Sequence, residues 1–163
     1  LRRSRGLGDV YKRQDLDTVL VCDAGTPGIS DPGYLLVRKC IQEEVLVEAL
    51  PGPTALIPAI VGSGFPSDRF IFDGFLPLKK GRKSRISEWQ HEKRTIIFYE
   101  SPHRLMRCLK EMKDILGGNR SICVAREISK LYETYHRGTI DELIFYFSEN
   151  EIKGELVILI SQK

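Results

Sequence analysis

The sequence predicts an α/β fold, with a truncated parallel α/β domain followed by a smaller mixed α+β domain. Two apolar runs, residues 19–21 and 45–50, are typical of buried strands, and each leads through a Gly/Pro-rich loop into a helical pattern. Two such units in tandem indicate neighbouring parallel strands, because crossovers between parallel strands are nearly always right-handed. From residue 69 onward, strand and helix patterns mix in an α+β order, which predicts the second domain.

The turn-rich residues 62–68 are the natural boundary between the two domains. We therefore expect a partial amino-terminal α/β domain over residues 15–64 and a carboxy-terminal α+β domain over residues 68–163. Two parallel strands with one crossover do not make a stable doubly wound sheet. The first domain is therefore expected to lack part of its sheet at the amino terminus.

Residues 1–14 show neither a helical nor a strand period, and we expect them to be a non-native or disordered leader. They hold five basic residues and one acidic residue. The chain as a whole has a net charge of +3, so residues 15–163 have a net charge of −1. The overall basic charge is therefore no argument for a nucleic-acid partner, and such an argument has to be local.

The second domain can be divided into elements by pattern alone. Ser101 and Pro102 are typical of a helix start, and Thr139 is a candidate cap for a helix of roughly ten residues. In chain order the sequence predicts a strand at 69–75, a polar helical arm at 79–90, a strand at 94–100, a helix at 102–116, strands at 121–125 and 134–137, the helix after Thr139, and a strand at 155–160.

Composition excludes several classes of protein. No apolar run approaches the roughly 18 residues that a membrane span needs, which indicates a soluble protein. The four cysteines lie far apart with no Cys-x-x-Cys pair, so we expect free thiols in a reducing, cytoplasmic compartment and no metal site.

The two Gly/Pro-rich loops are the first candidate site. In residues 22–33, three glycines allow close approach of the backbone to a ligand, while Asp31 is the expected N-cap and Pro32 the expected first residue of the next helix. The second loop comprises residues 51–54. Because the carboxyl ends of parallel strands lie at one edge of a sheet, both loops should form a single pocket for a small ligand, built mostly from backbone.

A run of basic residues in the arm is the second candidate site. Five cations in seven residues, without an acid, form a surface that could bind phosphates: Lys79, Lys80, Arg82, Lys83 and Arg85. The alternative is a solvated helix face, the commoner role of a charge run. Trp89 is expected to pack the arm against the domain, with stacking on an RNA base as the alternative.

These motifs together resemble the tetrapyrrole-methylase superfamily and, within it, the branch that methylates small-subunit ribosomal RNA. The resemblance covers nearly all of residues 18–160. The motifs that carry it are DAGTP (23–27), SDPG (30–33), LPGP (50–53), FPSDRF (65–70), GFLP (74–77), FYESPHR (98–104), AREISK (125–130) with Glu133, and KGE (153–155).

The resemblance implies a homodimer that uses S-adenosylmethionine to methylate the ribose 2′-hydroxyl of a cytidine in 16S rRNA of the small ribosomal subunit. It makes residues 15–64 part of the cofactor-binding domain and the basic arm an RNA-binding segment. The residues that it implies hold the cofactor are Asp23, Ala24, Gly25, Thr26, Pro27, Ser30, Asp31, Pro51, Gly52 and Pro53.

Methyl transfer to a ribose hydroxyl needs orientation and assistance from a base or a cation. The first candidates are Glu127 and Lys130, because they follow a buried strand where polar side chains would face a cleft. The alternative for this pair is a structural ion pair. Glu100 and His103 are the second candidates.

Two other functions stay open at this point. A tetrapyrrole C-methyltransferase would have the same fold, although it has no use for a Lys/Arg arm. A non-catalytic fragment that only binds RNA or dimerises is the other alternative, because the opening portion of the family pattern, with its first strand and Gly-rich cofactor loop, has no match in residues 1–14.

Overall fold

The computed structural model describes residues 17–162, so the leader predicted at residues 1–14 lies outside the described residues. The chain forms two compact units, Leu1–Pro53 and Thr54–Lys163. The boundary expected at residues 62–68 lies inside the second unit, because helix α2 (Leu56–Ser63) packs on the sheet of that unit.

The first unit contains helix α1 (Tyr34–Gln42), the helix that the sequence predicts after the first Gly/Pro-rich loop. The strands predicted at 19–21 and 45–50 are not formed, and their apolar side chains are exposed. A strand is stable only where a neighbouring backbone supplies hydrogen bonds, and the described part of this unit contains no strand to supply them.

The predicted start of α1 is also wrong by two residues. Gly33, not Asp31, is the N-cap, with no side-chain hydrogen bond to the helix. Gly33 has φ of +147°, which no helical residue adopts, so it separates Pro32 from the first helical residue, Tyr34.

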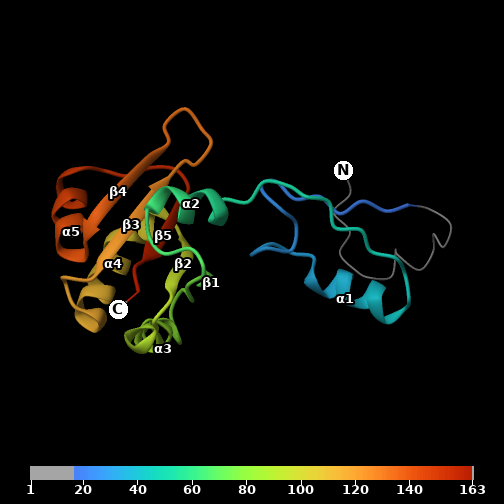
Figure 1. The fold of residues 1–163 in the computed structure, drawn as a ribbon, viewed down its shortest axis with the longest axis horizontal. Coiled ribbons are helices and arrows are strands. Elements are labelled where there is room, and N and C mark those ends of the chain that lie inside the picture. Colours follow the sequence, from blue (N-terminus) through green and yellow to red (C-terminus); the bar gives the residue numbers. More distant parts are fainter. Residues whose placement is uncertain (1–16, 163) are drawn as a thin grey trace. The chain divides into compact units, whose positions relative to one another are not determined.

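The second unit is built on one mixed five-stranded sheet with the order β1-β2-β5-β3-β4 (Figure 1). Only β1 and β2 are parallel, and the other neighbours are antiparallel. Between β1 and β2 lies α3, followed by a 3₁₀ turn at Trp89–His91. The bounds are β1 Phe70–Phe75, α3 Arg82–Glu88, β2 Thr95–Glu100, α4 Pro102–Leu116, β3 Ser121–Arg126, β4 Thr134–Thr139, α5 Ile140–Glu149 and β5 Leu156–Ile160.

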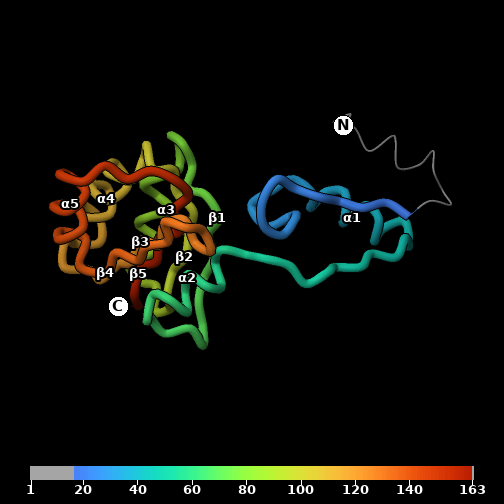
Figure 2. The backbone as a smooth tube through the Cα atoms, turned by 90° about the horizontal axis from the view of Figure 1, so that it is seen from above, coloured from blue at the N-terminus to red at the C-terminus, as the bar shows by residue number. Residues whose placement is uncertain are grey.

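Each central strand contributes side chains to two cores. Phe98 and Ile158 point into a core covered by α3, α4 and α5, whereas Ile97 and Leu159 point into a second core covered by α2. Figure 2 shows α4 and α5 on one side of the strands and α2 on the other. The period-2 pattern of the strands therefore fills both faces, and every residue of β5 is buried.

Local signals in the second unit are confirmed. Pro102 begins α4 after the N-cap Ser101, and Thr139 forms a capping box with Glu142 at the start of α5.

All four cysteines are free thiols, and burial raises the pKa of Cys108 to about 12 and that of Cys123 to about 11. Neither buried thiol is therefore a reactive thiolate near neutral pH.

None of the helices in residues 17–162 has both the length and the apolar character to cross a membrane. Within the same residues, no group of three or more His, Cys, Asp or Glu side chains is arranged to hold a metal ion.

Candidate functional site

In the first unit the two Gly/Pro-rich loops are in contact. The hydroxyl of Thr26 donates a hydrogen bond to the carbonyl oxygen of Pro53 at 2.8 Å. Two glycines lie at this contact: a Cβ on Gly25 would be 3.7 Å from the Pro53 oxygen, and one on Gly52 would be 3.6 Å from the Thr26 hydroxyl. Segments 27 residues apart in sequence thus form one continuous loop surface.

The backbone of the first loop is largely unpaired. Among the described residues, the one backbone hydrogen bond within residues 22–33 runs from Ile29 N–H to Thr26 C=O at 3.3 Å. Gly25, Gly28 and Ser30 all have positive φ, so the chain turns back repeatedly and presents peptide groups outward. The ten residues predicted to hold a cofactor are all exposed or half-buried.

In the second unit the structure brings Glu127 and Lys130 together. The Lys130 ammonium lies 3.0 Å from Oε1 of Glu127 and 3.0 Å from Oε2 of Glu155. The same Glu127 oxygen accepts the backbone N–H of Glu155 at 2.8 Å, while the Glu127 N–H donates to the Glu155 carbonyl at 3.0 Å. Glu127 therefore ties the loop after β3 to the residue before β5.

This loop holds an unusual amount of backbone strain. Glu127 and Ser129 have φ of +50° and +64°, a region that residues with side chains seldom occupy. Opposite them, Gly154 has φ of +94°, and a Cβ there would lie 2.5 Å from the Glu127 carboxyl carbon. Strained non-glycine residues often occur at functional sites, so this loop stays a candidate site.

Electrostatics favour a positioning role for this pair. The backbone hydrogen bond with Glu155 and the side-chain bond with Lys130 lower the pKa of Glu127. Hydrogen bonds to Glu155 and Glu127 raise the pKa of Lys130. Both groups therefore stay charged near neutral pH, whereas an efficient general base has a pKa close to the working pH.

A titration of Glu127 distinguishes the two roles. We expect the carboxyl carbon of Glu127, followed by NMR, to titrate below the ordinary glutamate value of about 4.3. Because its folded pKa is lowered, its contribution to stability is present above the unfolded pKa and is lost as pH falls. Lys130→Gln should move the midpoint upward. A midpoint above the ordinary value in the wild-type chain would instead support a general base.

The second pair of catalytic candidates is not brought together. Glu100 is fully buried and its carboxylate is occupied by arginines and by the N–H of Ser101 at 2.8 Å. His103 is exposed on the first turn of α4. Glu100 is therefore a structural anion in this fold.

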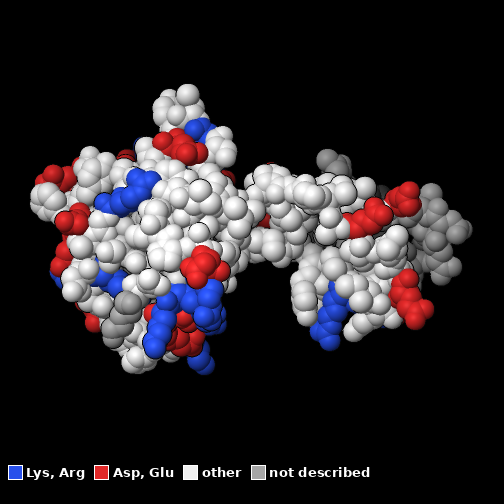
Figure 3. Space-filling view, viewed as in Figure 1, with Lys and Arg blue, Asp and Glu red and all other residues white. Residues whose placement is uncertain are grey.

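The basic arm divides into a buried part and an exposed part. Lys79, Lys80 and Lys83 are exposed, and Arg85 is half exposed and pairs with Glu88 at 2.9 Å. Figure 3 shows Lys and Arg atoms gathered over α3, with acidic atoms among them. Phosphate binding by these exposed cations stays a prediction.

Arg82 is a correction to the predicted RNA-binding set. Its side chain is 1 % exposed, and its Nη2 lies 2.7 Å from Glu100 while its Nε lies 2.6 Å from Glu111. Burial by itself lowers the pKa of Arg82, but the hydrogen bonds to Glu111 and Glu100 outweigh it and the pKa is raised. A guanidinium held in this way does not face a phosphate.

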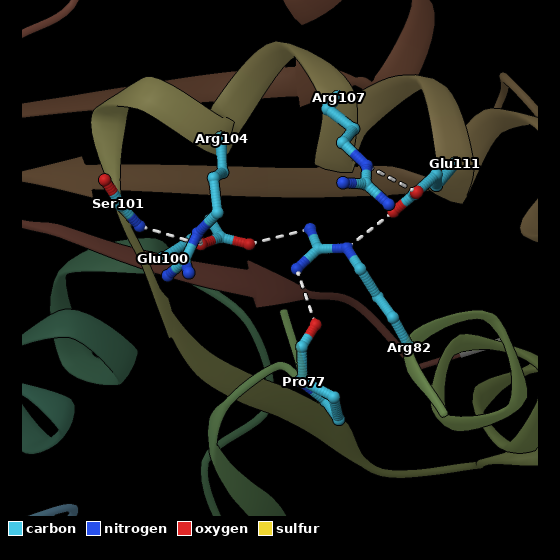
Figure 4. Close-up of polar contacts among 7 residues, drawn as sticks. All are labelled: Pro77, Arg82, Glu100, Ser101, Arg104, Arg107 and Glu111. Atoms are coloured by element: carbon cyan, nitrogen blue, oxygen red, sulfur yellow. Dashed lines mark hydrogen bonds and ion pairs between the residues drawn. The ribbon is translucent and has the colours of Figure 1, made fainter. Parts of the chain in front are cut away.

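The partners of Arg82 are themselves paired, as Figure 4 shows. Arg104 donates to the second oxygen of Glu100 at 2.7 Å, and Arg107 donates to the second oxygen of Glu111 at 2.9 Å. The network therefore joins the start of α3 to the end of β2 and to α4. It connects two motifs that the sequence leaves separate, the basic arm and residues 98–104.

Trp89 packs the arm against the domain, as the sequence predicts. Its side chain is 3 % exposed, its ring lies 5.0 Å from that of Phe98, and its Nε1 donates to Asp73 at 2.7 Å. Sequence reasoning missed Asp73 and Glu111 as partners of the arm, because both lie in other elements and no local pattern marks them.

The chain belongs to the tetrapyrrole methylase family, since the family model Tetrapyrrole (Corrin/Porphyrin) Methylases matches residues 8–144. It is 51% identical over 148 residues to a Ribosomal RNA small subunit methyltransferase I of Vibrio cholerae, which covers 89% of this chain and 51% of that protein. The chain spans about half the length of the first curated relatives it matches.

Solved structures of the family confirm the fold. The methyltransferase CobJ matches with a TM-score of 0.63 and 18% identity, over 85% of this chain and 62% of that one. Uroporphyrin-III C-methyl transferase from Thermus thermophilus, complexed with S-adenyl homocysteine, matches with a TM-score of 0.58 and 18% identity, over 84% and 62%. At this identity the likeness concerns the fold alone.

Proposed function

We propose that this chain is part of an S-adenosylmethionine-dependent methyltransferase that modifies the ribose 2′-hydroxyl of a cytidine in 16S rRNA. The observation that carries the proposal is the joined pair of Gly/Pro loops, in which the Thr26–Pro53 hydrogen bond unites two exposed or half-buried segments. The similarity to the Vibrio cholerae relative supports RNA as the substrate class.

The loop residues fit a cofactor of this kind. Positive φ at Gly25 and Gly28 exposes peptide groups, and a Cβ on Gly28 would meet nothing within 4 Å, so the loop is open enough for close approach. The cofactor supplies an electrophilic methyl group. The residues proposed to hold it are Asp23, Ala24, Gly25, Thr26, Pro27, Ser30, Asp31, Pro51, Gly52 and Pro53.

On the acceptor side, we assign Glu127 and Lys130 to orientation of the ribose. The paired carboxylate stays anionic and can accept a hydrogen bond from the ribose hydroxyl. Holding two reactants in line supplies much of the acceleration in displacement reactions. Because the lowered pKa of Glu127 makes it a weak base, proton abstraction is not its proposed contribution.

The exposed cations Lys79, Lys80, Lys83 and Arg85 are proposed to contact rRNA phosphates. A substrate in ribosomal RNA supports the proposal of a cytoplasmic protein, and the resemblance to the family supports the proposal of a homodimer. No specific observation favours the tetrapyrrole-ring alternative, because its structural likeness is limited to the fold.

The test is a calorimetric titration of S-adenosylhomocysteine into this chain and into a chimera that adds the portion of the Vibrio cholerae relative that the chain does not span. We expect binding to the chimera and weaker or no binding to the chain alone. Thr26→Val in the chimera removes the bond between the loops and should weaken binding about two- to tenfold. Tyr34→Phe, on the exposed surface of α1, is the matched control.

Binding to neither protein would remove the cofactor assignment of the two loops. The chain would then be a non-catalytic module, and its remaining function would be RNA binding or dimerisation.

A further inference from the structure

An exposed aromatic ring lies at the end of the edge strand β1. Phe75 is 53% exposed, although its ring packs edge-on against Tyr99 of β2 at 5.4 Å with an interplanar angle of 60°. Phe72 packs on the same tyrosine at 5.0 Å. Three aromatic rings therefore form a short row on one face of the sheet, and the outermost ring faces solvent.

A β-bulge puts the Phe75 ring on this face. Side chains three residues apart on a regular strand point to opposite faces, so Phe72 and Phe75 should not share one. The register between β1 and β2 shifts between them, and Gly74 has φ of +62°. Asp73 is turned to the other face, where its carboxylate accepts from Trp89 Nε1. The strand thus departs from its regular pattern at the residue that leaves an apolar ring exposed.

The exposed cations follow at once in the chain. Lys79 is the fourth residue after Phe75, so the two Cα atoms are at most about 14 Å apart. Lys80 and Lys83 come next and are exposed as well, while the buried Arg82 fixes the start of α3 between them. Figure 3 shows Lys and Arg atoms gathered over α3. An exposed aromatic ring followed within a few residues by exposed cations is complementary to an unpaired base with its phosphates.

We propose that Phe75 is a stacking platform for an unpaired RNA base whose flanking phosphates contact Lys79 and Lys80. The inference rests on the proposed function in taking RNA as the substrate, and adds to it a base-contacting residue and a preference for single-stranded over paired RNA. Stacking on an aromatic face is tolerant of sequence, so this residue contributes affinity and strandedness rather than base identity.

The experiment measures binding of a fluorescent, mixed-sequence, single-stranded 12-nucleotide RNA to the full chain. Phe75→Leu keeps an apolar side chain but removes the ring, and should weaken binding about fivefold or more. Phe75→Trp should retain or tighten binding. Phe145→Leu is the matched control, because Phe145 is 68% exposed on α5, which covers the opposite face of the sheet, and it should leave affinity unchanged.

The salt dependence separates stacking from charge. Changing Lys79, Lys80 and Lys83 to Ser should reduce the slope of log K against log salt by up to about 2, since each phosphate contact in single strands contributes about 0.7. Phe75→Leu should lower affinity at every salt concentration without changing the slope. A thermal unfolding curve for each variant checks that the fold is retained.

Each outcome decides between the proposals. If the lysine variant weakens RNA binding and neither Phe75 variant changes it, the proposal that Phe75 stacks on a base is wrong, and the proposal that the lysines contact phosphates is supported. If the wild-type chain does not bind the RNA at low salt, both the platform and the RNA-binding arm are wrong. Sedimentation of wild-type and Phe75→Leu chains then tests whether a second copy covers the ring instead.

Discussion

Replacing Arg82 by alanine is expected to cost about 3–5 kcal/mol of unfolding free energy, the largest effect among the five cations of the arm. The change leaves the Glu100 carboxylate fully buried with Arg104 as its one remaining charged partner, and removes the strongest contact of Glu111. Breaking a buried pair is costly because the charge left behind has lost its water and its counter-charge. Urea denaturation should show a lower midpoint with an unchanged slope.

Lys83→Ala is the matched control, since it removes a neighbouring exposed cation of α3 and should change stability by less than about 0.5 kcal/mol. Arg107→Ala should have an intermediate effect, because it removes the more exposed of the two partners of Glu111. If Arg82→Ala lowers the free energy of unfolding by no more than Lys83→Ala does, the ion-pair network makes no net contribution to stability.

The contribution of this network to stability is expected to decrease as pH falls. Burial alone raises the pKa of Glu111, but the hydrogen bonds from Arg82 and Arg107 outweigh it and the pKa is lowered. Its contribution to stability is therefore present above the unfolded pKa and is lost as pH falls through the lower folded pKa. The difference between wild type and Arg82→Ala should shrink on acidification.

Arg82 shows why the arm was only partly predictable. The sequence places five cations together and gives no sign that one of them is buried, because its partners lie 18 and 29 residues away on β2 and α4. Phe75 was missed for a related reason. A bulge at Gly74, which sequence periodicity does not reveal, brings its ring to the face that carries Tyr99.

Elements of the second unit were predictable because their signals are local. The Thr139–Glu142 capping box and the Ser101–Pro102 helix start are read within four residues. The position of β5 between β2 and β3 was not predictable in this way, since it depends on pairings between residues 30 to 64 positions apart in the chain. In the first unit the composite loop site was expected from the parallel pairing of two strands, yet the loops meet through a side-chain hydrogen bond without that pairing.

The apolar segments 19–21 and 46–50 are expected to become protected strands when their sheet is completed. In this chain Val19 is 79% and Leu46 is 83% exposed, and among the described residues no backbone N–H of either segment donates a hydrogen bond to another backbone group. Adding the portion of the Vibrio cholerae relative that the chain does not span should slow amide exchange in both segments about a hundredfold or more, as expected for residues that enter a cooperative sheet. Mass-spectrometric hydrogen exchange measures this directly.

The amides of β5 are the internal control, because that strand is already paired on both sides and its exchange should not change. A chimera carrying Val21→Asp tests whether burial drives the effect: a charge on the predicted buried face should abolish the new protection in residues 19–21. Unchanged exchange in a chimera that nevertheless binds S-adenosylhomocysteine would show that the loops are organised by the Thr26–Pro53 contact alone. In that case the apolar pattern of these segments serves some contact other than strand pairing.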